Sequence, residues 1–189
     1  GPYEIERLGH SIRSMVSTMR HLMDDIIEQE AQKRRSELDV LQSQINPHFL
    51  YNTLDSVIWM TEAGRYDEAI QMVTSLARLF RIALSKGNSM IPLSDELEHA
   101  RHYMTIQQIR YKNKFETKIT AQPDTEGLYT LKLIVQPILE NAIYHGIKRR
   151  RGRGQITVTG RRQAGGMYFA VEDNGMGMTP ERLAEVRAS

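Results

Sequence analysis

The chain has 189 residues, enough for one or two domains with hydrophobic cores, and its 40% hydrophobic and 25% charged residues are ordinary for a soluble protein. It has no cysteine, which excludes a disulfide scaffold and thiolate metal sites, and a net charge of +2 argues neither for nor against nucleic acid. No apolar run approaches the roughly 20 residues that cross a bilayer. Gly1-Pro2 resembles a protease-cleavage scar, so we expect the natural protein to continue upstream, where a membrane segment could lie.

Residues 3 to 62 are predicted to form a nearly continuous helix. Apolar residues alternate spacings of three and four in its first part: Ile5, Leu8, Ile12, Met15, Met19, Leu22 and Ile26. This heptad seam breaks over 29–37 and resumes in another phase at Leu38, Leu41 and Ile45. The pattern favours a coiled coil that holds two chains together, and a coil whose register transmits a signal is the alternative. A single helix of roughly 90 Å would need a partner to be stable.

Pro47 stands inside this helical pattern, directly before His48. A proline within a helix removes one backbone hydrogen bond and clashes with the carbonyl four residues earlier, so it predicts a kink. The kink would lie beside a side chain that can carry a proton, a metal or a phosphoryl group.

Two more helices follow before the pattern changes. The first is predicted over 67–84, and its broad apolar face suits a helical bundle. The second follows Pro92, with Ser94 as a plausible N-cap, and ends near Tyr111. We expect a domain boundary near residue 112. Beyond it, a two-layer α/β domain is predicted from a strand at 115–119, a helix at 131–148, a hairpin of strands 155–160 and 167–173, and a helix start at Thr179-Pro180.

Two segments of the α/β part suggest a ligand site. Glu140 and Asn141 lie within the helical pattern, either as part of a polar face or as a site where the amide oxygen of Asn141 meets Mg²⁺. Asp173, Gly175 and Gly177 follow a strand, where two glycines let the backbone approach a ligand closely. The alternative for the second segment is a tight strand-to-helix turn, and two glycines alone are weak evidence for a ligand. The position of this segment downstream of Glu140 and Asn141 gives the ligand interpretation its weight.

Together these segments resemble a known family. Segments 140–141 and 173–178 resemble the N box and the first glycine box of the GHKL ATP-binding fold. Segment 44–52, Gln-Ile-Asn-Pro-His-Phe-Leu-Tyr-Asn, resembles the phosphoacceptor box of the LytS/YesM-like branch of sensor histidine kinases. Segment 3–9 resembles the second half of a HAMP relay module, and two further segments match the same branch, 92–97 and 107–111.

The resemblance implies a role for each candidate residue. His48 would accept the γ-phosphoryl group of ATP, and Asn52, one turn later, would orient its ring or position a water for dephosphorylation. Asn141 would help to hold Mg²⁺, with Glu140 polarising the site. The other positions would contact the nucleotide: His145 and Gly146 near the phosphates, Asp173 at the adenine amine, and Gly175 and Gly177 where the nucleotide approaches the backbone.

The implied fold class is α+β: a long coiled-coil helix and a helical dimerisation bundle, followed by an incomplete two-layer α/β ATP-binding domain. Residues 3–37 would form the HAMP C-terminal helix and signalling coil, 38–111 the dimerisation and phosphotransfer helices, and 112–189 the truncated catalytic domain. The implied protein is a bacterial homodimer, the cytoplasmic portion of a membrane protein. Its partner would be a response regulator, often a DNA-binding transcription factor, so no direct contact with nucleic acid is expected.

Two departures from the family pattern affect this reading. Phe49 stands where many histidine kinases carry an acidic residue directly after the phosphoacceptor, so the base is not evident. The family's next glycine-rich box and its ATP lid should follow residue 189. Their absence motivates the alternative hypothesis of a catalytically incompetent scaffold for dimerisation and signal relay. A GHKL ATPase of the chaperone or topoisomerase kind ranks last, because the histidine box and the coil have no place in it.

For two smaller features, a structural or solvent-exposed role is favoured over ligand binding. His99 and His102 are three apart on a helix and could share a metal, but packing or surface roles are favoured. The basic run 148–153 could meet nucleic acid, but a solvated loop near the nucleotide phosphates is favoured.

Overall fold

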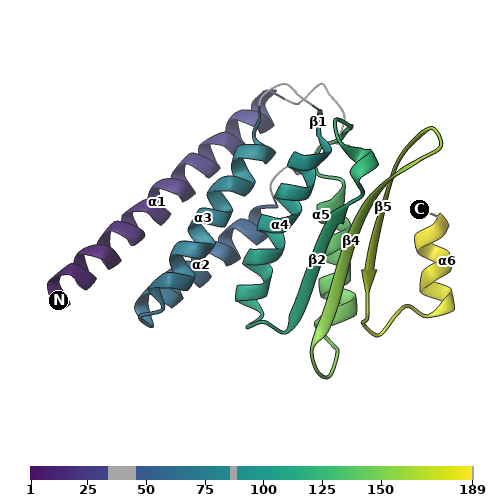
Figure 1. Cartoon of the computed structure of the whole chain (residues 1–189). Coiled ribbons are helices and arrows are strands. Elements are labelled where there is room, and N and C mark those ends of the chain that lie inside the picture. Colours follow the sequence, from purple (N-terminus) through teal and green to yellow (C-terminus); the bar gives the residue numbers. More distant parts are fainter. Residues whose placement is uncertain (34–45, 86–88, 189) are drawn as a thin grey trace. The chain divides into compact units, whose positions relative to one another are not determined.

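The computed structural model describes residues 1–33, 46–85 and 89–188 (Figure 1). The chain divides into two compact units, Gly1–Ala77 and Arg78–Ser189. Among the described residues, none of the helices combines the length and the apolar character that crossing a bilayer requires.

The first unit is helical and contains α1 (Pro2–Lys33), α2 (Pro47–Glu62) and most of α3 (Tyr66–Ala83). α1 packs against α2. The interior side of α2 carries Leu50, Leu54 and Val57, all with no exposed surface. α1 buries Ile12, Val16 and Met23, whereas four members of the predicted seam are exposed in the single chain: Ile5, Leu8, Met15 and Leu22.

The prediction of one continuous helix through Pro47 is wrong. Asn46 has an extended backbone (φ −72°, ψ 111°) and caps α2, so Pro47 is the first residue of a new helix. At that position the missing N–H of proline has no intrahelical partner to lose, and its fixed φ suits the start of a helix. The predicted phase change of the seam at Leu38, Leu41 and Ile45 lies outside the described residues.

The second unit alternates helices and strands. Its elements are β1 (Met90–Pro92), α4 (Leu93–Arg110), β2 (Phe115–Ala121), the short 3₁₀ helix η2 (Pro123–Thr125), β3 (Tyr129–Leu131), α5 (Val135–Asn141), the π-helical segment η3 (Ala142–Ile147), β4 (Gly154–Gln163), β5 (Gly166–Asp173) and α6 (Pro180–Ala188). β2, β4 and β5 form a three-stranded sheet in that order, with β2 parallel to β4 and β4 antiparallel to β5. β1 and β3 form a separate antiparallel pair.

Helices cover one face of the three-stranded sheet. α4 packs on β2 and on α5, and η3 packs on β4 and β5 (Figure 1). The inward side chains of the strands alternate with outward ones, as a half-buried sheet requires. Phe115, Ile156 and Val158 are fully buried in this core, whereas Glu116, Gln155 and their neighbours on the other face are exposed. This arrangement confirms the predicted α+β class, with helices followed by a layered α/β part.

Several predicted element limits need correction. α4 starts at Leu93 and has no side-chain cap, so Ser94 is not its N-cap. The helix predicted from residue 131 starts at Val135, because Leu131 belongs to β3 and Leu133 has a left-handed backbone (φ 62°). The predicted hairpin is confirmed, with Gln163 paired to Gly166. The division into compact units after residue 77 places α4, which packs on β2, in the second unit, and the domain boundary near residue 112 stays a prediction.

Candidate active site

The phosphoacceptor-type box forms the start of α2. The Oδ1 atom of Asn46 accepts hydrogen bonds from the backbone N–H of His48 (3.0 Å) and of Phe49 (3.4 Å). These donors are among those that a helix N-terminus leaves without intrahelical partners. The cap therefore fixes the backbone around His48. The imidazole of His48 is exposed in the single chain.

The neighbours of His48 separate into buried and accessible side chains. Phe49 and Leu50, the next two residues, are 5% and 0% exposed and anchor the first turn in the core. Asn52 is half-buried one turn further, and its carbonyl accepts a hydrogen bond from the Ser56 hydroxyl at 2.8 Å. Because Phe49 is buried and apolar, it supplies no base to the ring.

Polar contacts tie α2 to α1 next to the histidine. The Tyr51 hydroxyl donates to Asp24 at 2.5 Å, and this bond raises the pKa of the phenol. The Arg20 guanidinium pairs with Asp55, and it also lies 5.9 Å from the centre of the Tyr51 ring. The helix that carries His48 thus contacts the predicted signalling helix through charged as well as apolar groups.

The N-box residues lie at the end of α5, where the helix widens. Asn141 is the last residue of α5 and is exposed, and Glu140 accepts a hydrogen bond from the buried Gln136 at 3.1 Å. The next six residues, Ala142–Ile147, are π-helical, and the N–H of Lys148 bonds to the carbonyl of Ile143 at 2.9 Å. Such wide turns occur frequently at functional sites. His145 is exposed on this segment.

The glycine-box residues form a tight turn after β5. The Asp173 carboxylate accepts a hydrogen bond from the N–H of Gly175 at 2.9 Å. The Asn174 side chain accepts another from the N–H of Gln155 at 2.7 Å, which fastens the turn to β4. Gly177 has a left-handed backbone (φ 73°), which favours glycine.

The two boxes are in direct contact. A Cβ atom added to Gly146 would lie 2.5 Å from Oδ1 of Asp173, and one added to Gly175 would lie 2.4 Å from backbone atoms of Gly146. Only glycine allows backbones to approach this closely. The structure therefore brings Gly146, Asp173 and Gly175 together, with Asn141 and His145 on the same helical segment as Gly146. His48 and Asn52 belong to the other unit.

Sequence reasoning missed two residues that hold this turn. The Arg150 guanidinium donates to the carbonyl of Asn174, and the backbone of Gln155 both donates to and accepts from Asn174. The signal for Arg150 was present as a basic run close to the N box, but nothing in the run distinguishes Arg150 from its neighbours. Lys148 instead lies 4.5 Å from the centre of the Tyr144 ring.

The paired histidines of α4 have different surroundings. His99 is 1% exposed, and burial lowers its pKa to about 4, with smaller contributions from His102 and Lys132. His102 instead lies 3.0 Å from a carboxylate oxygen of Glu98. Within the described ranges, the structure has no cluster of three or more His, Cys, Asp or Glu side chains that could hold a metal. The favoured packing role for His99 is consistent with this burial.

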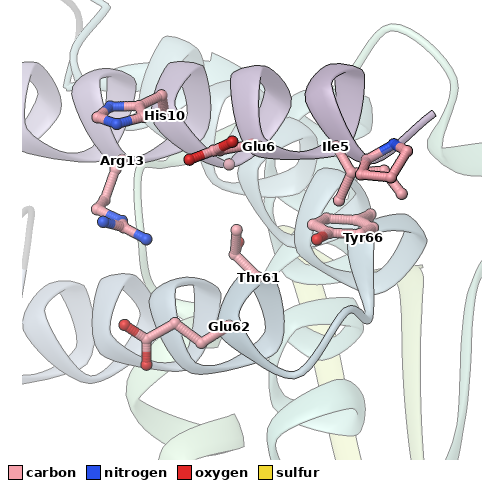
Figure 2. A pocket seen from close by; sticks show the side chains of 9 residues that line it. Ile5, Glu6, His10, Arg13, Thr61, Glu62 and Tyr66 are labelled. Atoms are coloured by element: carbon pink, nitrogen blue, oxygen red, sulfur yellow. The ribbon is translucent and has the colours of Figure 1, made fainter.

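A separate pocket of about 400 Å³ lies between α1 and the end of α2 (Figure 2). Its lining includes charges of both signs, from Glu6, Arg13 and Glu62, together with His10 and Tyr66. None of the predicted site residues lines it, so it is distinct from the phosphoacceptor and nucleotide boxes.

Comparison with known proteins matches both parts of the chain. A family model described as histidine kinase matches residues 36–115, and one described as histidine kinase-, DNA gyrase B- and HSP90-like ATPase matches residues 128–188. The first match is to a segment of histidine kinases and the second is to a GHKL-type ATP-binding domain.

Curated relatives identify the branch. Sensor histidine kinase YesM of Bacillus subtilis (strain 168) is 32% identical over 175 residues, which are 93% of this chain and 30% of YesM. Sensor histidine kinase BtsS of Escherichia coli (strain K12) is 28% identical over 94% of this chain and 34% of BtsS. Sensor protein LytS of Bacillus cereus is 28% identical over 96% of this chain and 31% of LytS. The chain belongs to the LytS/YesM-like sensor histidine kinases, and it spans about a third of the length of these three relatives.

Proposed function

We propose that this chain is the phosphoacceptor and nucleotide-binding part of a two-component sensor histidine kinase, which uses ATP to phosphorylate His48 and passes the phosphoryl group to an aspartate of a response regulator. The observation that carries the proposal is the close packing of Gly146 on Asp173 and Gly175, because it joins two sequence boxes into one surface. The exposed imidazole on a capped helix supports His48 as the acceptor.

In the proposed reaction, a ring nitrogen of His48 attacks the γ-phosphorus of ATP. A nitrogen–phosphorus bond forms, the bond from that phosphorus to the bridging oxygen breaks, and ADP leaves. The ring proton passes to solvent, since Phe49 offers no base. Asn52 follows His48 by one helical turn, and we assign it the orientation of the ring or of a water molecule. Catalysis of this kind depends mainly on positioning and on charge neutralisation.

The nucleotide is proposed to bind across the two packed boxes. Asp173 would accept a hydrogen bond from the adenine amine, and its exposure in the structure leaves room for that contact. Gly175 and Gly177 would admit the nucleotide close to the backbone. His145 and Gly146 would lie near the phosphates, at the end of the widened helical segment.

The residues present fit a magnesium ion that is shared with the nucleotide. Mg²⁺ keeps several waters and usually takes only one or two protein oxygens together with substrate phosphates. The exposed amide of Asn141 would supply one such oxygen, and the carboxylate of Glu140 lies next to it in sequence. The ion would neutralise charge that develops on the phosphates.

The proposed assembly is a homodimer. Ile5, Leu8, Met15 and Leu22 follow heptad spacing on α1 and are between 39% and 54% exposed in the single chain. Pairing this stripe with a second copy would bury it, as a coiled coil requires. We further propose residues 3–37 as the end of a HAMP relay and signalling coil, 38–111 as the dimerisation and phosphotransfer part, and 112–189 as the catalytic part. Upstream segments would connect them to the bacterial cell membrane, and the regulator would be a DNA-binding transcription factor.

Labelling of the full-length kinase with γ-labelled ATP tests the proposal. We expect an acid-labile, base-stable phosphate that disappears in His48→Ala. His21→Ala is the matched control, since His21 is also an exposed histidine on a helix of the same unit. Equal labelling of His48→Ala and the wild type would refute the assigned acceptor, and no saturable ATP binding by the full-length protein would instead favour a scaffold.

A further inference from the structure

A buried carboxylate lies outside the nucleotide boxes. Glu96 is on α4 and has no exposed surface. A buried charge requires hydrogen-bond partners to offset the loss of water. Burial raises the pKa of Glu96, and the N–H groups of residues 133–135 together with the charge of Lys132 act in the opposite direction. Such a costly group needs a structural or functional reason.

The partners of Glu96 are two backbone N–H groups, one in the turn just before α5 and one in the first residue of α5. One carboxylate oxygen accepts a hydrogen bond from the N–H of Leu133 at 2.9 Å, and the other accepts one from Val135 at 3.0 Å. Ile134, the residue at the N-cap position, makes no side-chain cap hydrogen bond. Glu96 therefore caps α5 from another helix, and its negative charge is favourably placed at a helix N-terminus.

The same bonds hold a strained turn. Leu133 has a φ of 62°, in the left-handed region that is unfavourable for a non-glycine residue. Its N–H is one of the two groups that Glu96 binds. A backbone held in this region depends on its surroundings, so loss of the carboxylate should let the turn between β3 and α5 relax.

α5 transmits the position of this turn to the N box. The helix is seven residues long, Val135–Asn141, and ends in Glu140 and Asn141. A helix rises about 1.5 Å per residue and is stiff over so short a span. Any shift or rotation at Val135 is therefore carried to Asn141.

We propose that Glu96 is a positioning residue for the nucleotide site, which sets the placement of α5 so that Glu140 and Asn141 face the nucleotide and its ion. This inference rests on the proposed ATP-binding function. Glu96 touches no substrate, and it acts on the reaction only through the backbone of residues 133–135.

Glu96→Gln is the informative substitution. A glutamine has nearly the same shape but one acceptor oxygen, so it keeps one of the two bonds and turns an NH₂ group toward the other donor. Glu98→Gln is the matched control, because Glu98 lies on the same helix, has a 48% exposed side chain, and pairs with Arg101 and His102 of that helix. Glu96→Asp keeps the charge on a shorter side chain and serves if Glu96→Gln does not fold.

In the full-length kinase, we expect Glu96→Gln to raise about tenfold both the KM for Mg-ATP and the Mg²⁺ concentration that gives half-maximal activity. The assay temperature should lie well below the thermal midpoint of the variant, so that the protein is folded. Glu98→Gln should match the wild type in both constants. A residue with only a structural role would lower the amount of active protein without moving either constant. Wild-type constants in folded Glu96→Gln, or in Glu96→Asp if the glutamine variant does not fold, overturn the proposal.

Hydrogen exchange separates this inference from the function on which it rests. Amides of residues 133–141 should exchange at least tenfold faster in Glu96→Gln, or in its aspartate replacement, than in Glu98→Gln. This measurement needs neither ATP nor turnover. If the wild type fails to bind ATP, the proposed function fails, whereas equal exchange in the Glu96 and Glu98 variants overturns the capping role itself.

Discussion

The contact between the two nucleotide boxes gives the sharpest prediction. In Gly175→Ala the new methyl carbon would lie 2.4 Å from three backbone atoms of Gly146, its Cα, C and O. Carbon atoms in contact are normally about 3.5 Å apart or more. The obstacle is backbone and cannot rotate away, so the turn and the helical segment must separate by about 1 Å.

That displacement sets the expected magnitude. A misplacement of about 1 Å in an active site can lower the rate by about 100-fold. Forcing extra volume into a packed site typically destabilises a protein by about 1 to 3 kcal/mol. We therefore expect Gly175→Ala in the full-length kinase to fold with a lowered thermal midpoint and to autophosphorylate about 100-fold more slowly.

Two glycines of the same unit provide controls for this measurement. Gly166→Ala introduces a methyl group with nothing within 4 Å, so the labelling rate should stay within about twofold of the wild type. Gly177→Ala also has open space but a φ of 73°, so it should show backbone strain of about 1 to 2 kcal/mol without the steric clash. Equal labelling rates for Gly175→Ala and Gly166→Ala would refute the close packing of the boxes.

Three further predictions follow from the cap, the buried histidine and the basic run. Asn46→Ala should lower the free energy of unfolding by about 1 kcal/mol, because two N–H groups at the start of α2 lose their acceptor, whereas Asn46→Asp should retain it, as measured by urea unfolding. The pKa of His99 is lowered from 6.5 to about 4 in the folded protein, so between these two pH values the unfolded state binds more protons than the folded state. The wild type should therefore lose about 3 kcal/mol of unfolding free energy as the pH falls from 6.5 to 4. Unfolding curves at pH 7 and pH 4.5 should show this loss in the wild type and not in His99→Leu. Arg150→Ala should weaken ATP binding about tenfold by calorimetry, because the Asn174 carbonyl loses its donor, and Arg149→Ala should not; equal affinities would contradict this role.

Local patterns in the sequence were sufficient for most of the second unit. The β4–β5 hairpin follows from alternating strands around a glycine-containing turn, and α6 follows from Thr179 and Pro180. The Thr179 hydroxyl accepts a hydrogen bond from the N–H of Arg182 at 3.3 Å, as a cap should. These features depend on residues that are close in the chain, so periodicity and turn chemistry reveal them.

Features that depend on distant residues could not be predicted in this way. β1 and β3 are only three residues long, and their pairing joins Ile91 to Thr130, far beyond the range of a local pattern. Glu96 looks like an ordinary acidic residue in the first turn of a helix, yet it binds the backbone of Leu133 and Val135. The start of α2 is hidden for another reason: a proline inside an apolar helical pattern indicates a kink, whereas here Asn46 caps a new helix that begins at Pro47.

The candidate nucleotide-binding residues could be identified from the sequence because segments 140–141 and 173–178 resemble two boxes of a known ATP-binding fold. Sequence could name Gly146 and Gly175, but it could not show that they meet each other, because that contact joins the end of a helix to the end of a strand. The roles assigned to Asn141, Asp173 and His48 remain predictions that the labelling and binding experiments test.

The widened helical segment from Ala142 to Ile147 matters for transferring knowledge between members of this branch. A π turn contains about one residue more than an α turn, which rotates everything after it by about 100° about the helix axis. A relative whose helix is shorter by that single residue would keep an asparagine at the position of Asn141 but would turn a different side chain toward the place where we propose that His145 meets the phosphates. Homologous kinases in which every aligned letter agrees up to this point can therefore differ in phosphate contacts through chain length alone.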